Sequence, residues 1–335
     1  MPSTLPGVPD IDEQLAADVL EQLGVVEERL RASVATSDDM VRWTGRHLMD
    51  AGGKRVRPML VLLAASLGDI KAESVIEAAV LVELTHLASL YHDDVMDSAP
   101  TRRGTDSAHA LWGNNVAILT GDFLFARASA LSARIGTSAV REHSETFERL
   151  CLGQLHETVG PTAEDDHFTH YISVLSDKTA SLLALAGSLG ASLGGGPEGS
   201  AEVMRRYGEK IGVAFQLADD VLDLESDAST SGKTPGIDLR EGVPTMPTLL
   251  VRRRAAEKQD ARSLDMIARL DGDLSSDAAL DELVSLLRED PALEETRELA
   301  QRTADEAVEI LAELPAGPVR DALTAFTRTL VERKS

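Results

Sequence analysis

Apolar residues between positions 75 and 90 recur at intervals of three and four, which predicts one long helix with a single buried face. The positions on that face are Val75, Ile76, Ala79, Val80, Val82, Glu83, His86, Leu87 and Leu90. This helix leads directly into an acidic segment, residues 92–97. Upstream, Gly52 and Gly53 are expected to end a helix, and Pro58 to open the next one. The pattern therefore predicts a tight cationic loop between two helices.

A second apolar segment, ASLLALAGSLGASL at residues 180–193, is interrupted only by Ser and Gly. It is typical of a buried helix whose small residues let a neighbour approach closely. The segment GGGPEG at 194–199 is expected to be a loop between helices. We find no alternating strand pattern of useful length, no heptad array and no fixed-period repeat, so an all-α fold in a single domain is the simplest architecture.

Pro2, Pro6 and Pro9 predict a flexible N-terminal tail at residues 1–10, which leaves 11–335 for the domain. The longest uninterrupted apolar run, residues 59–65, is far shorter than the roughly 20 residues needed to cross a bilayer. The first residues also lack the basic and apolar regions of a secretory signal. We therefore expect no transmembrane segment and a cytoplasmic protein.

Composition narrows the classes of function. The 335 residues contain 56 acidic and 33 basic side chains, which gives a formal charge of −23. This negative charge repels nucleic-acid phosphate and argues against a nucleic-acid partner. Apolar residues make up 43% of the chain and aromatic residues only 3%, which favours helices built from Ala, Leu and Val over a β-sandwich. The single cysteine, Cys151, forms no internal disulfide.

Two short acidic motifs carry the chemistry: HDDVMD at 92–97 and ADDVLD at 218–223. Each places three aspartates at positions i, i+1 and i+4, so that on a helix the carboxylates converge on one small volume. Like-charge repulsion makes such a cluster costly without a cation. Ligands that are all oxygen favour a hard ion such as Mg²⁺. Chance in an acid-rich chain is disfavoured, and a calcium loop lacks its glycine and its alternating ligands here.

Basic residues lie beside these acids, although the chain as a whole is anionic. They occur in GGKRVRP at 52–58, in TRRG at 101–104, in KTA at 178–180 and in SGK at 231–233. A divalent metal together with Arg and Lys is the combination that holds a diphosphate, because Arg offers a fork of donors and Lys a point charge. The joint placement favours a diphosphate site over scattered surface residues.

With these motifs in order, the chain resembles the trans-isoprenyl diphosphate synthases, the polyprenyl synthetase family. The resemblance extends from GGKRVRP through ELTHLASLYHDDVMDSAPTRRG, GDFLFARA, DKTASLLALA and FQLADDVLD to the closing helical region. It implies a single all-α domain, a helical bundle around a central cavity, with the two acidic motifs at its mouth. It also implies a homodimer.

The resemblance assigns roles to individual residues. Three Mg²⁺ ions against an allylic diphosphate would be held by Asp93, Asp94, Asp97, Asp219 and Asp223. The catalytic and allylic-diphosphate residues would be Arg102, Lys178, Thr179, Gln216 and Lys233. The diphosphate of isopentenyl diphosphate, the second substrate, would be bound by Gly53, Lys54, Arg57, His86 and Arg103. A lone histidine on an apolar helix face is usually a core residue, but the position of His86 ahead of the acids favours a ligand.

The chemistry accounts for these residue types. Breaking the allylic carbon–oxygen bond releases diphosphate, whose developing charge metal ions and basic side chains stabilise. The double bond of isopentenyl diphosphate then attacks the allylic cation and a proton is lost, by family analogy to the released diphosphate. Water must be kept away from the cation, so an apolar cavity is expected below the metals.

In related enzymes, bulky residues one turn before the first motif block growth of the product. Here those positions are Ala88 and Ser89, which predicts an open floor and a long product of at least six isoprene units. Two departures from the family pattern matter. Tyr91 replaces an aliphatic residue and could narrow the upper cavity, and Val243 and Met246 replace a basic residue and Leu after the second motif.

Three other functions stay open. A short-chain synthase making the farnesyl or geranylgeranyl diphosphate is the nearest. A class I terpene cyclase shares the first motif but usually has a second metal motif with Asn, Ser and Glu, and it needs no isopentenyl diphosphate. The regulatory subunit of a two-chain synthase would tolerate decayed metal motifs, whereas both motifs here are complete.

The assignment of the cavity wall predicts that Ala88→Phe shortens the product, because the larger side chain would block the elongating chain. Chromatography of the dephosphorylated prenols measures this directly. An unchanged product distribution would show that Ala88 does not line the wall.

Overall fold

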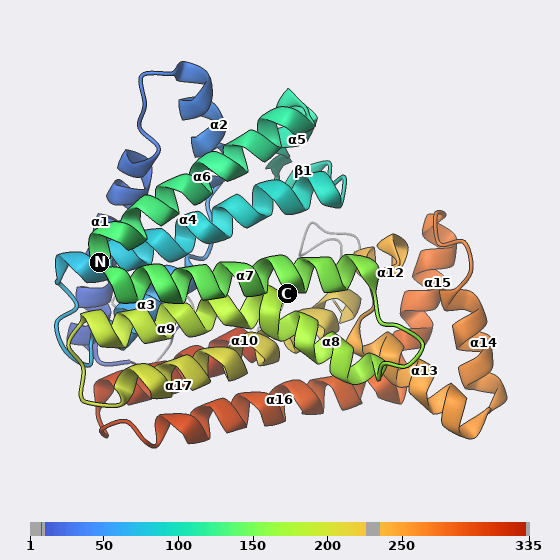
Figure 1. The fold of residues 1–335 in the computed structure, drawn as a ribbon. Helices are drawn as coiled ribbons and strands as arrows, with labels where there is room; N and C mark the ends of the chain where they lie inside the picture. The colour runs from blue at the N-terminus through green and yellow to red at the C-terminus, as the bar shows by residue number, and fades with distance from the viewer. Residues whose placement is uncertain (1–7, 9–10, 226–234, 333–335) are drawn as a thin grey trace. The chain divides into compact units, whose positions relative to one another are not determined.

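The computed structural model describes residue 8 and residues 11–225 and 235–332. The regular structure of the described chain is helical apart from one hairpin of two strands with two residues each, which confirms the all-α class (Figure 1). The expected tail at 1–10 falls, except for Val8, outside the described residues. That expectation therefore stays a prediction.

The chain divides into two compact units, each discontinuous in sequence. The first unit comprises Met1–Glu148, Leu182–Gly208 and Ile310–Ala325. The second unit comprises Arg149–Ser181, Glu209–Glu309 and Phe326–Ser335. Each boundary between the two falls inside a helix. The expectation of one domain over 11–335 stays a prediction.

The elements of the N-terminal part are α1 (Glu13–Ser33), α2 (Asp39–Asp50), α3 (Val56–Ala65), α4 (Glu73–Met96), β1 (Thr101–Arg102), β2 (Thr105–Asp106), α5 (Ala108–Trp112) and α6 (Asn114–Ile135). The strands β1 and β2 are antiparallel, with Arg102 opposite Thr105. The middle part contains α7 (Thr137–Val159), α8 (His167–Leu175), the π-helical turn η1 (Ser176–Ala180), α9 (Ser181–Leu193) and α10 (Ser200–Glu225). The C-terminal part contains α12 (Ile237–Glu241), α13 (Met246–Lys258), α14 (Ala261–Leu270), α15 (Asp277–Arg288), α16 (Pro291–Leu311) and α17 (Pro318–Val331).

Helix α4 is the core helix of the first unit and packs against α6, α3 and α1 (Figure 1). Val75, Val82 and Leu87 of the predicted face are fully buried. Ala78, Leu81 and Leu84 on the other sides of α4 are fully buried too, so the expectation of a single buried face is wrong. The helix is longer than the apolar pattern and continues through Asp93 and Asp94. The first acidic motif is thus presented at the C-terminal end of a rigid, buried helix.

The loop before α3 is as tight as the glycines predict. Helix α2 ends at Asp50, and Gly52 and Gly53 follow with φ values of 94° and 147°. Arg55 adopts a left-handed conformation, with φ 48°. Helix α3 begins at Val56, so Pro58 occupies its third position rather than its first. The cationic segment between the helices is correspondingly shorter.

Close approach through small residues is confirmed for α9. A Cβ atom built on Gly190 would lie 2.3 Å from the carbonyl oxygen of Val61 in α3. One built on Gly187 would lie 2.6 Å from the carbonyl oxygen of Met204 in α10. The glycines therefore let α9 pack backbone to backbone against its neighbours in the first unit. Residues 194–199 form the predicted connection between α9 and α10.

The second unit has its own apolar core. It is formed mainly by α10, α13 and α15 through residues such as Leu217, Met246, Leu280 and Leu287. The acidic stretch from 257 to 290 forms helices with solvated outer faces. There Arg269 pairs with Asp265 at 2.9 Å and with Glu282 at 2.7 Å. Such exposed pairs stabilise little.

Two helices of the described chain are long and apolar enough, by length and composition, to cross a bilayer: α4 and α6. In α4, 72% of the apolar window is buried inside the protein, as in a core helix. In α6 only 39% is buried. The expectation of no transmembrane segment therefore stays a prediction for α6.

The contact of α9 with α3 predicts that Gly190→Ala lowers the free energy of unfolding by about 1–3 kcal/mol, because the added methyl group meets backbone that cannot move aside. Gly24→Ala is the matched control. Gly24 lies in α1 with no atom near its Cβ position, so the same change should stabilise by about 0.5–1 kcal/mol. Urea unfolding of both variants measures the difference, and a stabilised Gly190→Ala variant would contradict the packing.

Candidate active site

The first acidic motif lies at the C-terminal end of α4. Asp93 is half-buried, Asp94 is fully buried, and Asp97 is the exposed C-cap residue. The backbone N–H of Asp97 donates to the carbonyl oxygen of Asp93 at 2.8 Å, so the helix geometry persists to the cap. The three carboxylates thus begin in the interior and end in solvent.

Asp94 of this motif forms a salt bridge with Arg102. The Nε atom of Arg102, at the start of the β1–β2 hairpin, donates to Asp94 Oδ1 at 2.6 Å. The other oxygen, Oδ2, is buried and accepts no hydrogen bond. Burial raises the pKa of Asp94, and the Arg102 guanidinium opposes that shift. A buried carboxylate oxygen without a donor is a position that a hard cation fits.

The acidic side chains do not form a ready-made metal cage. Within the described ranges, no group of three or more Asp, Glu, His or Cys side chains is arranged to hold a metal ion by itself. Repulsion keeps carboxylates apart, and Arg102 draws Asp94 aside. An ion held by one or two carboxylates takes its remaining ligands from water or phosphate oxygens, as Mg²⁺ commonly does.

Arg55 in the cationic loop is committed to the fold. Its guanidinium forms salt bridges with Glu27 and with the buried Glu83, the latter at 3.1 Å. It also donates to the carbonyl oxygens of Met49, at 3.1 Å, and Gly52, at 3.2 Å. Every donor edge of the guanidinium is thus occupied by the protein, so Arg55 anchors the loop.

The structure brings together Gly53, Arg57, His86 and Arg103, four of the residues expected to bind isopentenyl diphosphate. A Cβ atom on Gly53 would lie 3.0 Å from the Arg103 guanidinium carbon. Burial and nearby Arg103 lower the pKa of Arg57 to about 10 against the opposing charge of Glu83, and its Nε atom is buried without a hydrogen-bond partner. The positive charges of Arg57 and Arg103 in this cluster are therefore not fully balanced by Glu83.

His86 lies in the same cationic cluster. Burial, followed by the charges of Arg57 and Arg103, lowers the pKa of His86 well below its ordinary value. The imidazole is therefore neutral at pH 7. Lys54 is exposed in the loop beside the cluster. The grouping of basic side chains around Gly53 suits a multiply charged anion.

In the second unit, Lys178 and Thr179 lie on the π-helical turn η1. Lys178 forms a salt bridge with Glu157 of α7, and Thr179 is buried. A Cβ atom on Gly153 of α7 would lie 2.7 Å from the backbone nitrogen of Lys178. Single π turns interrupt α-helices, frequently at functional sites. Here the turn sets the direction of the lysine.

Arg149 of α7 secures this π turn, a role that the sequence did not reveal. Its Nε atom donates to Asp177 Oδ1 at 2.8 Å, and Nη2 donates to Ser176 Oγ at 3.0 Å. The same guanidinium forms a salt bridge with Glu209 of α10. The two residues that precede Lys178 are thereby held in place.

The second acidic motif lies on α10. Asp219, Asp223 and the preceding Gln216 are half-buried. Asp220, however, turns away from them: Tyr171 Oη donates to its Oδ2 at 2.7 Å, and the backbone N–H of Met246 donates to the same atom at 2.9 Å. The expected convergence of all three carboxylates is therefore not met at Asp220. Burial raises the pKa of Asp220 to about 8.

Asp220 is a residue whose role was missed, because spacing alone could not show which aspartate faces the core. It ties α10 to α8 and to the start of α13. Lys233 lies outside the described residues. Of the chain-length positions, Ala88 is fully buried and Ser89 is half-buried, with Ser89 Oγ donating to the carbonyl oxygen of His86 at 2.9 Å.

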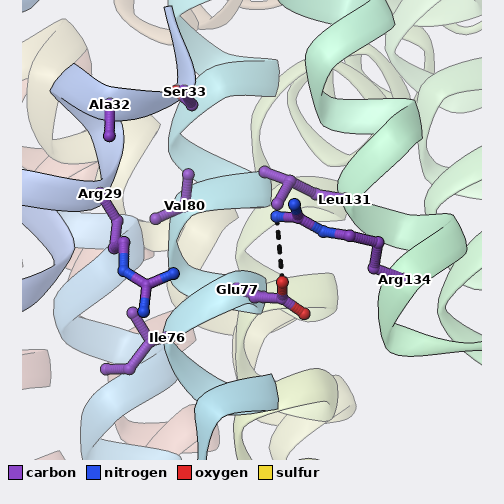
Figure 2. A pocket seen from close by; sticks show the side chains of 8 residues that line it. All are labelled: Arg29, Ala32, Ser33, Ile76, Glu77, Val80, Leu131 and Arg134. Carbon is purple, nitrogen blue, oxygen red and sulfur yellow. Dashed lines mark ion pairs between the residues drawn. The ribbon is translucent and has the colours of Figure 1, made fainter. Parts of the chain in front are cut away.

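A pocket of about 160 Å³ in the first unit lies apart from these motifs (Figure 2). Glu77, which lines the pocket, lies 16 residues before Asp93 on α4, roughly 24 Å away along the helix axis. Its charges are paired, since Arg134 contacts Glu77 at 3.0 Å and Arg29 contacts Glu73 at 2.8 Å. The lining includes Arg29, Ser33, Glu77, Val80, Leu131 and Arg134. We do not assign the pocket to the active site.

Comparisons with known proteins agree with these motifs. The family model described as polyprenyl synthetase matches residues 38–287. The nonaprenyl diphosphate synthase of Mycobacterium tuberculosis is 41% identical over 323 residues, which cover 96% of this chain and 95% of that protein.

Two solved structures resemble the whole chain. The polyprenyl synthase of Caulobacter crescentus CB15, complexed with calcium and isoprenyl diphosphate, is 32% identical with a TM-score of 0.86, covering 96% of this chain and 98% of that one. The geranylgeranyl pyrophosphate synthase of Corynebacterium glutamicum, also complexed with calcium and isoprenyl diphosphate, is 38% identical with a TM-score of 0.85 and the same coverage.

The contrast between Arg55 in the loop and Arg57 in α3 gives a prediction. Arg55→Met should lower the free energy of unfolding by about 3 kcal/mol, because it leaves Glu83 buried without its partner. Arg57→Met should change it by less than about 1 kcal/mol, because the Arg57 Nε atom is already buried and unpaired. Urea unfolding distinguishes them, and equal losses in both variants would contradict the division between an anchoring and a ligand-binding arginine.

Proposed function

The chain belongs to the polyprenyl synthetase family, and on that premise we propose that it condenses isopentenyl diphosphate with an allylic diphosphate to make a long-chain all-trans-polyprenyl diphosphate. The chain is thus an enzyme of the polyprenyl diphosphate synthase type. The observation that carries the proposed reaction is the cluster of Arg57, His86 and Arg103 around Gly53, in the same compact unit as the first acidic motif. An anion site and an acidic motif together are what two diphosphate substrates require.

Residues of the two acidic motifs would hold Mg²⁺, three ions by family analogy. The ligands would be Asp93, Asp94, Asp97, Asp219 and Asp223. The buried, donor-free Oδ2 atom of Asp94 and the all-oxygen ligand set support a hard divalent ion, as does the calcium in the two related structures. When bound, Mg²⁺ supplies charge that stabilises the departing diphosphate.

Basic side chains complete the allylic-diphosphate site. Arg102 holds Asp94 through Nε, which leaves the two terminal amino groups of its fork to donate to phosphate oxygens. Lys178 would exchange Glu157 for the diphosphate, since both partners are anionic. Lys233, Thr179 and Gln216 keep the roles that the family resemblance implies. These residues bind and orient the leaving group.

The second substrate would occupy the cationic cluster. Gly53 allows close approach of the backbone, and Lys54, Arg57 and Arg103 supply positive charge. Neutral His86 would donate one hydrogen bond to the diphosphate of isopentenyl diphosphate. This arrangement holds the attacking double bond in position, which supplies much of the rate enhancement in such reactions.

We propose a product of at least six isoprene units, because Ala88 and Ser89 are small. The nonaprenyl relative supports this length. The geranylgeranyl pyrophosphate synthase that is 38% identical supports a second candidate, a short-chain synthase. Both candidates use the same chemistry and differ only in where elongation stops.

We further propose a cytoplasmic homodimer. In α6, Ile118 and Leu119 expose 40% and 65% of their surfaces. A second copy of the chain would cover these two apolar side chains. A dimer would also account for the low burial of this long apolar helix without a bilayer. Family resemblance favours the same assembly.

The test incubates the purified chain with Mg²⁺, labelled isopentenyl diphosphate and dimethylallyl, geranyl or farnesyl diphosphate. We expect prenols of six or more units after dephosphorylation, and no product without isopentenyl diphosphate. Asp93→Asn should lower kcat/KM by about 100-fold or more, because one anchor for the leaving group's counter-charge is lost. Asp281→Asn, an exposed aspartate on α15, is the control and should match the unmodified chain.

Other outcomes separate the alternatives. Products that stop at three or four units would identify a short-chain synthase. Consumption of a prenyl diphosphate alone would identify a cyclase. No release of diphosphate by the pure chain would favour a regulatory subunit. Sedimentation of the same preparation determines whether the chain is a dimer.

A further inference from the structure

Tyr91 stands two residues before Asp93, and its side chain is fully buried. Its hydroxyl group donates to the carbonyl oxygen of Thr44 and accepts from the backbone N–H of Leu48 at 3.3 Å, both in α2. Residues 44 and 48 are the i−4 and i partners of an ordinary helical hydrogen bond. The hydroxyl group therefore contacts both backbone groups of one helical turn of α2.

The hydroxyl group links α4, which carries the first acidic motif, to α2, because it bonds to backbone groups four residues apart in α2. It serves one donor and one acceptor at once. The ring spans from α4 to α2, and its polar end is turned to α2. This is a different role from the expected narrowing of the upper cavity.

The end of α2 that Tyr91 contacts also holds Arg103 of the cationic cluster and Arg55 of the neighbouring loop. Arg103 Nη1 donates to the carbonyl oxygen of Leu48 at 2.9 Å and also to that of Gly52. Arg55 donates to the carbonyl oxygens of Met49 and Gly52. The last carbonyl groups of a helix lack partners within it and attract cations. The position of this helix end therefore determines the position of both arginines.

We propose that the Tyr91 hydroxyl group is a positioning group that sets residues 52–57, the cationic loop and the first residues of α3, relative to the first acidic motif. The inference rests on the proposed function, in which the loop binds isopentenyl diphosphate. Tyr91 is joined rigidly to Asp93 and Asp94 through the last turns of α4. Its hydroxyl group fixes α2, and the end of α2 fixes Arg103 and the loop. All of these residues belong to the first unit.

Removal of the hydroxyl group should weaken one substrate and spare the other. Without it, the N–H of Leu48 and the carbonyl group of Thr44 lose their contact with α4, which frees the end of α2 to move. The acidic motif stays in place because it belongs to α4. Binding of isopentenyl diphosphate should therefore weaken, while binding of the allylic diphosphate should not change.

The test compares Tyr91→Phe with Tyr207→Phe by steady-state kinetics. Tyr207 is the matched control, because it is equally buried in the first unit and its hydroxyl group donates to the carbonyl oxygen of Leu323 at 3.0 Å. We expect Tyr91→Phe to raise the KM for isopentenyl diphosphate at least fivefold and to leave the KM for the allylic diphosphate within twofold. Tyr207→Phe should leave both KM values unchanged.

Two further measurements sharpen the test. Hydrogen exchange should accelerate in residues 44–55 of Tyr91→Phe and not in those of Tyr207→Phe. Tyr91→Leu, which restores an aliphatic side chain, should raise the same KM without lengthening the product. A longer product with an unchanged KM would show instead that Tyr91 narrows the cavity, and would overturn the inference.

The failure of this inference differs from the failure of the proposed function. If the unmodified chain forms no prenyl product, the proposed function fails. If the unmodified chain is active and Tyr91→Phe keeps its KM for isopentenyl diphosphate, or raises both KM values equally, only the positioning role fails.

Discussion

The buried carboxylate of Glu83 is the charge on which the first unit's site depends. It is 2% exposed and lies in the middle of α4, where an unpaired anion would cost several kcal/mol. Its partner is Arg55, and the charges of Arg57 and Arg103 also act on it. Together with Glu27, which also pairs with Arg55, Glu83 allows three arginines to gather in an apolar helical body. Glu83 makes a concentrated positive site compatible with folding, while leaving that site undersupplied with anions.

Most of the fold could be predicted from the chain itself, because its dominant signal is helical periodicity. The helix that contains Val75, the close approach at Gly190 and the loop at 194–199 all follow from local rules that tertiary contacts do not overturn, whereas the burial of that helix on nearly all sides comes from its neighbours. The helix start near Pro58 was displaced by two residues, since Arg55 takes a left-handed conformation and caps the helix. Helix ends depend on such caps and are less regular than helix interiors.

The site divides in the same way. The family resemblance predicted the group around Gly53, because it assigned those residues to one diphosphate. The roles of Arg55, Arg149 and Asp220 could not be predicted, since each depends on partners from distant parts of the chain. Sequence identifies a basic or acidic side chain but does not show whether the protein or a ligand neutralises it. That distinction comes from burial and from the partners that folding brings together.

The π turn at 176–180 has a consequence for how this family of chains can diverge. Such a turn accommodates one residue more than an α-helical turn. Loss of a single residue there would restore regular α-helical winding and keep the two flanking segments in nearly the same rotation, so that the side chains inside the turn would be the ones to change direction. The direction of the Lys178 side chain therefore depends on the number of residues in the turn as well as on their chemical types. A change of length in this turn would therefore redirect the amine of Lys178.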